Sequence, residues 1–128
     1  MLTIAQAELI VQRVLRCAAQ DNLENNIAVA VADAHGELMC FTRRDNAPFP
    51  AAVLARNKAY TAARDRQASS SLGAWAKKTG KDMGYWTDDR ITGIAGGVPV
   101  IVDGKVVGGV GVSGLDEWED ERLALAGL

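Results

Sequence analysis

The sequence predicts one α+β domain over residues 1–128, with hairpin-linked strands in an antiparallel sheet and helices packed on it. Two observations predict this class. Residues 27–43 and 98–113 each hold two apolar, strand-like runs separated by a short turn, as in a β-hairpin. Segments with helical rhythm or high alanine content lie before, between and after them. With 128 residues, 48% of them hydrophobic, the chain can bury one sizeable core.

The N-terminal segment predicts an amphipathic helix over residues 3–20. Its apolar residues recur at three- and four-residue intervals, which places them in one stripe along a helix. Thr3 followed by Gln6 fits a capping box, so the helix is expected to begin sharply. A polar break at residues 21–26 ends it.

The first hairpin follows at residues 27–43. Over 27–33, β-branched residues share one face of the strand and alanines share the other. Small side chains on the second face suit close packing, most simply of a helix. The chain is expected to turn at 34–36 and to return as a second strand over 37–43.

The middle of the chain predicts two helices. Residues 44–50 form a loop by composition, and 51–66 form an alanine-rich helix without internal Gly or Pro. Three serines at 69–71 offer an N-cap for a weaker helix over 72–78. Residues 81–90 are expected to be irregular.

The last third predicts strands at 98–102 and 105–113, joined by an Asp-Gly turn and preceded by a weak strand near 91–94. Glycines in the last strand favour a helix or a second subunit lying flat on the sheet. A final helix is expected over 117–126, begun by a capping box of Asp116 and Glu119.

Composition and charge exclude several classes of protein. The net charge of −2 and the sequence pI near 5.3 argue against a non-specific nucleic-acid binder. No apolar run reaches the roughly 18 residues of a membrane helix, and the N-terminus lacks the order of a signal peptide. We therefore expect a cytoplasmic protein without a membrane partner. Cys17 and Cys40 are expected to be buried, reduced thiols. These cysteines and His35 lack the spacing of a metal site, so no metal is expected.

Four stretches, in this order and at this spacing, resemble the GlcG/HbpS-like family, also labelled the haem-degrading domain family: VADAHGELMCFTRRDNA, ARNKAYTAA, GGVPVIVDGKVVGGVGVSG and DEWEDERLALAGL. The resemblance covers the chain from about Thr3 to Leu128. It implies a profilin-like fold, a five-stranded antiparallel sheet flanked by helices, assembled into dimers or larger even oligomers. It also implies haem or corrinoid-related ligands in some relatives, and a place in catabolic pathways in others.

The candidate site residues lie at the ends of strands and on the second long helix. Arg44 presents a planar fork suited to a carboxylate, although the following Asp45 could instead pair with it. Lys58 either reaches into a pocket or lays its stem over neighbouring alanines. Thr61 shares that helix face, and Ser113 ends the last strand. We expect Arg44, Asp45, Lys58 and Ser113 to converge between helix and sheet, around a small oxygen-rich anion.

Three functions fit these residues. The first is a binding protein for haem, another tetrapyrrole or a small carboxylate, in a catabolic or biosynthetic pathway. The ligand would be bound by Arg44, Thr61, Gly97 and Ser113. The second is a cofactor-independent isomerase, tautomerase or lyase, in which Arg44 and Lys58 hold an oxyanion. In that enzyme Asp45, Lys58 and Glu121 are the candidate catalytic residues, with Asp45 or Glu121 moving the proton. The third is a non-catalytic oligomeric accessory protein.

No cofactor is expected to be required, although haem could bind. Its axial ligand would come from His35, Tyr85 or Met39. Because His35 has no partner at ligand spacing, we expect that it does not bind a metal. Four aromatic residues either form a flat pocket or pack in core and interface, namely Trp75, Tyr85, Trp86 and Trp118. The small-residue strand face and the glycines of the last strand predict an even-numbered homo-oligomer.

Overall fold

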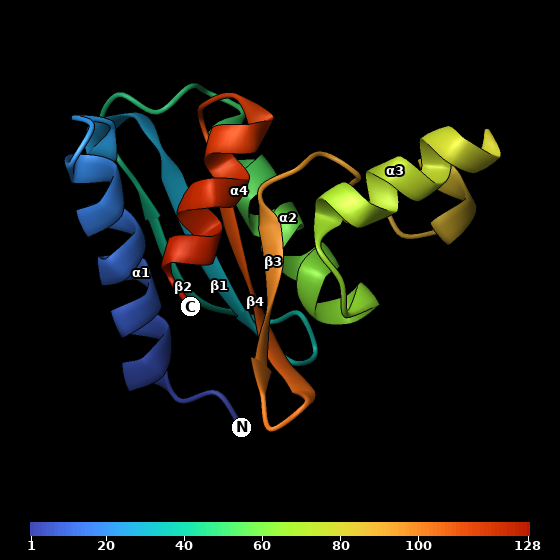
Figure 1. The fold of residues 1–128 in the computed structure, drawn as a ribbon, viewed down its shortest axis with the longest axis horizontal. Coiled ribbons are helices and arrows are strands. Elements are labelled where there is room, and N and C mark those ends of the chain that lie inside the picture. Colours follow the sequence, from blue (N-terminus) through green and yellow to red (C-terminus); the bar gives the residue numbers. More distant parts are fainter.

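The structure is a computed structural model that describes residues 1–128, and its centre is one four-stranded antiparallel sheet in the order β2–β1–β4–β3. The strands are β1 (Ala28–Asp33), β2 (Leu38–Arg43), β3 (Gly97–Val102) and β4 (Lys105–Ser113). The helices are α1 (Ile4–Ala19), α2 (Ala51–Asp65), α3 (Ser69–Thr79) and α4 (Glu117–Ala126). Short 3₁₀ turns lie at η1 (Glu24–Asn26) and η2 (Met83–Trp86). Helices α1 and α4 cover one face of the sheet, and α2 covers the other (Figure 1).

The predicted start of α1 is confirmed in detail. The Thr3 hydroxyl accepts a hydrogen bond from the Gln6 backbone N–H at 3.1 Å, and the Gln6 side chain accepts one from the Thr3 N–H at 2.8 Å. This reciprocal pair satisfies two backbone donors that a helix N-terminus leaves free. The buried stripe of the helix consists of Ala7, Ile10, Val11, Val14 and Ala18.

The predicted division of β1 into two different faces is also confirmed. Val29 and Val31 belong to the larger core, where residues of α1 and α4 pack on the sheet. On the other face, Ala28, Ala30 and Ala32 pack against Ala51, Ala55 and Ala59 of α2. Alanine on both surfaces lets the helix lie close to the sheet, which is why this second cluster needs no large side chains.

The glycines of β4 allow the same close approach. A Cβ atom at Gly111 would lie 2.6 Å from the backbone nitrogen of Ala59, and one at Gly109 would lie 2.9 Å from that of Ala63. The expectation that these glycines let a helix lie flat on the sheet is therefore confirmed. Because that helix is α2 of the same chain, these two strand surfaces no longer argue for a second subunit.

The predicted fifth strand at 91–94 is wrong. There the backbone bonds to side chains instead of to a neighbouring strand. The Thr92 N–H donates to the Thr61 hydroxyl at 3.0 Å, and the Ile94 carbonyl accepts from the Ser69 hydroxyl at 2.7 Å. With its donors and acceptors satisfied in this way, the segment stays irregular up to the start of β3.

Two predicted helix caps differ from the observed ones. Helix α3 begins at Ser69, and its N-cap is Ala68, so the serines lie in the first turn and do not cap it. Asp116 is the N-cap of α4 but makes no side-chain hydrogen bond. The acidic side chains after it face other partners, since Glu117 accepts from the Ala95 N–H and Asp120 from the Leu115 N–H.

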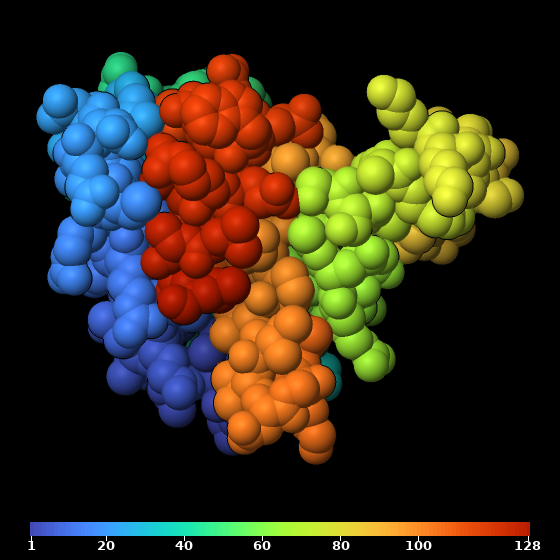
Figure 2. All heavy atoms as spheres, in the orientation of Figure 1, coloured from blue at the N-terminus to red at the C-terminus, as the bar shows by residue number.

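Helix α3 and the following η2 segment project from the body of the domain (Figures 1 and 2). The Trp75 and Trp86 rings pack edge to face within this projection, with centroids 4.8 Å apart. Cys17 and Cys40 form no disulfide, and both are partly buried against the larger core, so the expected burial is only partial. No helix has the length and apolar character needed to cross a membrane.

Candidate functional site

A polar cavity lies on the α2 side of the sheet, where the β1–β2 turn meets α2 and the segment before β3. Its volume is about 250 Å³. The lining residues are Ala32, Gly36, Glu37, Leu38, Arg56, Asn57, Tyr60 and Arg90, and we refer to this cavity as the arginine pocket. Its two guanidinium groups come from parts of the chain more than thirty residues apart.

Tyr60 holds the polar groups of the pocket in place. Its side chain is only 4% exposed, and its hydroxyl donates a hydrogen bond to the Asp88 carboxylate. The same hydroxyl accepts a hydrogen bond from Arg90 Nη2 at 3.1 Å, and the Arg90 guanidinium lies 3.9 Å from the centre of the Tyr60 ring. Hydrogen bonding and cation–π stacking therefore fix Arg90 against the helix.

The charge states of this cluster follow from its hydrogen bonds. The hydroxyl of Tyr60 stabilises the ionised Asp88, and this is the main reason that the pKa of Asp88 is lowered. The backbone N–H of Arg90, 3.0 Å from the second carboxylate oxygen, contributes in the same direction. The hydrogen bond to Asp88 also raises the pKa of Tyr60. At neutral pH Asp88 is thus an anion and Tyr60 a neutral phenol.

Few carboxylates lie close enough to neutralise the positive charges of the two arginines in the pocket. Arg56 donates its Nε hydrogen to the carbonyl of Ala52 at 3.2 Å and forms no ion pair. Arg90 approaches Asp88 only to 4.0 Å, and its side chain is 57% exposed. Glu37 also lines the pocket but pairs with neither arginine. Planar guanidinium groups with free N–H donors are suited to a ligand carboxylate.

Gly36 shapes the wall of the pocket. Its φ is +88°, a backbone region that residues with a side chain rarely adopt. A Cβ atom there would lie 2.6 Å from Cδ2 of Tyr60 and 3.0 Å from Cγ of Arg64. The glycine therefore lets the β1–β2 turn lie against the face of α2 that carries the pocket.

Lys58 points away from the arginine pocket, toward the end of the sheet. It is 1% exposed, and its Nζ donates to the carbonyl of Val112 at 2.9 Å and to Asp120 Oδ2 at 3.0 Å. Ser113, next to Val112, is also buried, at the end of β4. Burial raises the pKa of Asp120 to about 6, against the opposing influence of the Lys58 charge. Lys58 and Ser113 thus come near each other, in a protein-filled region.

Thr61, Gly97 and Glu121 all take part in contacts within the protein. Thr61 Oγ1 donates to the carbonyl of Arg90 at 3.3 Å and thereby anchors the segment that carries this arginine. The Gly97 N–H donates to Ser69 Oγ at 2.9 Å. Glu121 accepts a hydrogen bond from the hydroxyl of Ser70. These contacts join α2 to the segment before β3, α3 to the start of β3, and α4 to α3.

Arg44 and Asp45 lie beyond the end of β2. The Arg44 N–H donates to the carbonyl of Ile27 at 3.0 Å, and its side-chain Nε is buried without a hydrogen-bond partner. Asp45 is exposed and forms no ion pair with Arg44. No hydrogen bond or ion pair links either residue to Lys58 or Ser113. Their convergence on one ligand stays a prediction.

The three candidate haem ligands lie in different elements. His35 is exposed in the β1–β2 turn, beside the arginine pocket, and its carbonyl accepts from Arg64 at 3.2 Å. Met39 packs against the larger core, and Tyr85 is 67% exposed on η2. No group of three or more His, Cys, Asp or Glu side chains is arranged to hold a metal ion.

Arg56, Tyr60 and Arg90 are absent from the site residues expected from the sequence. One signal for them exists, because Arg56, Tyr60 and Arg64 follow one another at four-residue intervals on α2 and so share a helix face. The sequence carries no comparable signal for Arg90, since its segment has no regular secondary structure.

Fold and site together define the class: an α+β protein with helices on both faces of an antiparallel sheet, carrying a small polar pocket at the β1–β2 turn. The chain belongs to the HbpS-like family, whose model, described as "Haem degrading protein HbpS-like", matches residues 2–128.

Individual relatives agree with this assignment. Protein GlcG of Escherichia coli is 35% identical over 99 residues, which cover 75% of this chain and 72% of GlcG. The crystal structure of Klebsiella pneumoniae protein ORFY is similar with a TM-score of 0.88 and 29% identity, over 98% of this chain and 87% of ORFY. A double mutant of HbpS from Streptomyces reticuli has the same TM-score at 28% identity, over 98% and 84% of the two chains.

Proposed function

We propose that this protein binds a small molecule in the arginine pocket through a carboxylate of the ligand. The main supporting observation is that Arg56 and Arg90 line one cavity of about 250 Å³. Arg56 forms no ion pair, and the only ion pair of Arg90 is the 4.0 Å contact with Asp88. Asn57 and the neutral Tyr60 hydroxyl add polar groups that can orient the bound molecule. The volume lies just below the usual range for ligand pockets, which favours a small, oxygen-rich acid.

Haem is a second candidate ligand that could offer carboxylates to the two arginines. The family description names haem degradation, and HbpS is among the similar structures. A haem carries two propionate carboxylates, which the two arginines would hold. Its ring would then remain outside the cavity, because 250 Å³ is too small to enclose the macrocycle. Either ligand suits a protein of a catabolic or biosynthetic pathway.

Calorimetric titration with succinate and, separately, with haemin tests the proposal. The variants Arg56→Gln and Arg90→Gln keep side-chain length and polarity but remove the charge. We expect each to weaken succinate binding about tenfold, since a hydrogen bond to a charged group contributes about 1.5 kcal/mol or more. Arg16→Gln, an exposed change on α1, is the matched control and should have no effect.

The outcomes separate the alternatives. Binding of haemin without succinate would identify the propionate ligand. Loss of binding in Arg44→Gln, with Arg56→Gln unaffected, would move the site to the end of β2. Binding of neither ligand, or equal losses in Arg16→Gln and Arg56→Gln, would contradict the proposal.

A cofactor-independent acid–base enzyme is the second candidate. Its support is the raised pKa of Asp120, about 6, next to the ammonium of Lys58, because acid–base catalysts are tuned toward the working pH. Asp45 and Glu121 remain its proposed proton carriers. Isomerisation or β-elimination of small hydroxy acids by the wild-type protein would favour this candidate, and wild-type protein without such activity would contradict it.

A further inference from the structure

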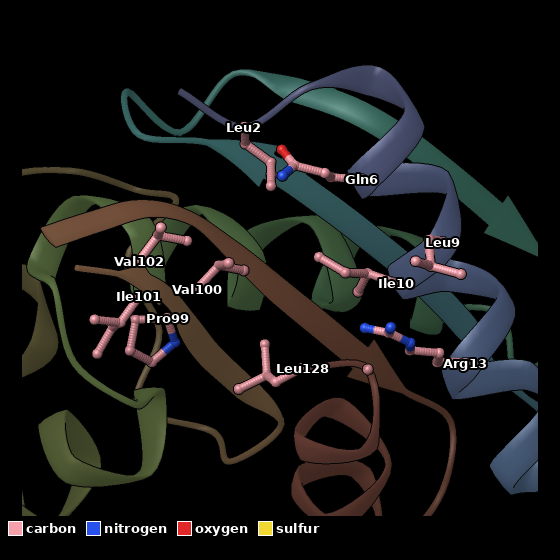
Figure 3. A pocket seen from close by; sticks show the side chains of 11 residues that line it. Leu2, Gln6, Leu9, Ile10, Arg13, Pro99, Val100, Ile101, Val102 and Leu128 are labelled. Carbon is pink, nitrogen blue, oxygen red and sulfur yellow. The ribbon is translucent and has the colours of Figure 1, made fainter. Parts of the chain in front are cut away.

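A second, larger cavity lies on the opposite face of the sheet, between α1, β3 and the C-terminal end of α4 (Figure 3). Its volume is about 440 Å³, and seven of its eleven lining residues are hydrophobic. We refer to it as the apolar cavity. Leu2 and Ile10 line it from the N-terminal segment and α1, Val100 from β3, and Leu128 from the C-terminal end of the chain. In Figure 2, α4 (red) ends between α1 (blue) and the β3–β4 hairpin (orange), next to this cavity.

The chain after α4 packs tightly against α1 at the edge of this cavity. Gly127 follows the helix, and a Cβ atom there would lie 2.8 Å from Ile10 Cγ2 and 2.9 Å from Val14 Cγ2. The chain after α4 therefore approaches α1 closely at Gly127, and the next residue, Leu128, lines the cavity. Beyond it, apolar side chains of the free edge strand stay open to solvent, with Ile101 58% exposed. A cavity with such walls favours an apolar occupant.

One positively charged side chain, that of Arg13, lines this cavity. Arg13 extends from α1, and its guanidinium points toward Leu128 (Figure 3). It forms no ion pair and donates no hydrogen bond within the protein. Gln6 lies beside Leu2, and its oxygen is already occupied by the Thr3 N–H, which leaves its amide hydrogens as donors. Arg13 is thus the one charged side chain among the lining residues, and it comes from α1, as Gln6 does.

We infer that the apolar cavity binds a monocarboxylate with an extended apolar body, such as a medium-chain fatty acid. The carboxylate would lie on Arg13, and the body would run along Ile10, Val100 and Leu128. Burying apolar surface supplies the affinity, at about 25 cal/mol per Å², and the single guanidinium sets the orientation. The arginine pocket differs in kind, because two guanidinium groups and a phenol surround a smaller space.

Titration with decanoate tests this inference. Decanol and succinate are the control ligands, and each has only one of the two features of decanoate. Decanol has the apolar body without the charge, and succinate has the charge without the body. We expect decanoate to bind at concentrations up to about 1 mM, and more tightly than decanol. Amide chemical shifts should change around Leu2, Ile10 and Val100, whereas succinate should leave these signals unchanged.

Two matched arginines on the same helix provide the protein-side control. Arg13→Gln should weaken decanoate binding about fivefold, as expected for an exposed ion pair of about 1 kcal/mol, and the loss should shrink at high salt. Arg16→Gln should not weaken it, because Arg16 does not line the cavity. Arg56→Gln should leave decanoate binding intact, which separates this site from the arginine pocket.

Three results would overturn the inference. The first is no decanoate binding in the millimolar range. The second is equal weakening by Arg13→Gln and Arg16→Gln, which would mean non-specific attraction to α1. The third is a set of shift changes centred on Tyr60 instead of Ile10.

Discussion

The Nζ atom of Lys58 lies 3.0 Å from Oδ2 of Asp120, and the two side chains are 1% and 2% exposed. Lys58 belongs to α2 and Asp120 to α4, helices that cover opposite faces of the sheet. The lysine passes the end of the sheet beside Gly96, where a Cβ atom would lie 2.8 Å from Nζ. This buried ion pair therefore ties together the two layers of helices around β4.

Breaking this pair on one side should destabilise the protein. Lys58→Met leaves a buried carboxylate without its partner, and we expect a loss of about 3 kcal/mol in the free energy of unfolding. Urea denaturation measures it, with the exposed Lys77→Met as control. The double variant Lys58→Met with Asp120→Leu should recover part of the loss. Unchanged stability together with lost succinate binding would instead assign Lys58 to the ligand, which is one of the two alternatives that the sequence leaves open.

Asp120 should also give the stability a distinctive pH dependence. Because burial raises its pKa from 3.8 to about 6, the folded chain holds more protons on this group than the unfolded chain within that interval. The free energy of unfolding of wild-type protein should fall, relative to Asp120→Asn, as the pH rises from about 4 to about 6. Urea denaturation across this range measures the difference. A relative rise would mean that the attraction of Lys58 outweighs the cost of burial.

The turn at Gly36 should be sensitive to the smallest side chain. Gly36→Ala places a methyl group at positive φ and against the ring of Tyr60, and should cost about 2 kcal/mol while weakening succinate binding. Gly104→Ala is the matched control, since its φ is +77° and nothing lies within 4 Å of the new Cβ. It should cost about 1 kcal/mol through backbone strain alone and leave binding unchanged. Thermal denaturation and calorimetry compare the two.

Haemin binding should not depend on His35. The residue is exposed in a turn and no second ligand of the usual kind is placed with it, so His35→Ala should give the same Soret spectrum as wild type on titration with haemin. Met39→Leu and Tyr85→Phe test the other two candidates in the same way. A Soret band that disappears only in His35→Ala would make this prediction wrong.

We also expect an even-numbered oligomer. The projecting segment of α3 and η2 exposes Tyr85, α4 exposes Trp118, and the loop before α2 exposes Phe49. Large apolar side chains in such number at a surface are typical of protein contacts. Light scattering should give at least twice the chain mass of 13.6 kDa, and Tyr85→Ser with Trp118→Ser should lower that value. A wild-type mass near 13.6 kDa at micromolar concentration would contradict the expectation.

Local regularities of the sequence predict much of the fold. The two faces of β1, the capping box at Thr3 and the close packing permitted by Gly109 and Gly111 each depend on neighbours a few residues away or on side-chain size. The sequence-based prediction fails where a local pattern competes with hydrogen bonds to residues far away in the chain. At 91–94, side chains of α2 and α3 take the backbone hydrogen bonds that a strand would need.

The sequence by itself determined the α+β class, the family and the positions of the helices and hairpins, because periodicity and turn residues act over short stretches. Only the tertiary structure decided which polar residues meet. Tyr60 and Arg90 are thirty positions apart, and Lys58 and Asp120 are sixty-two apart. Hydrogen bonds and ion pairs at such separations follow no spacing rule along the chain, so they exist only once the helices have packed on the sheet.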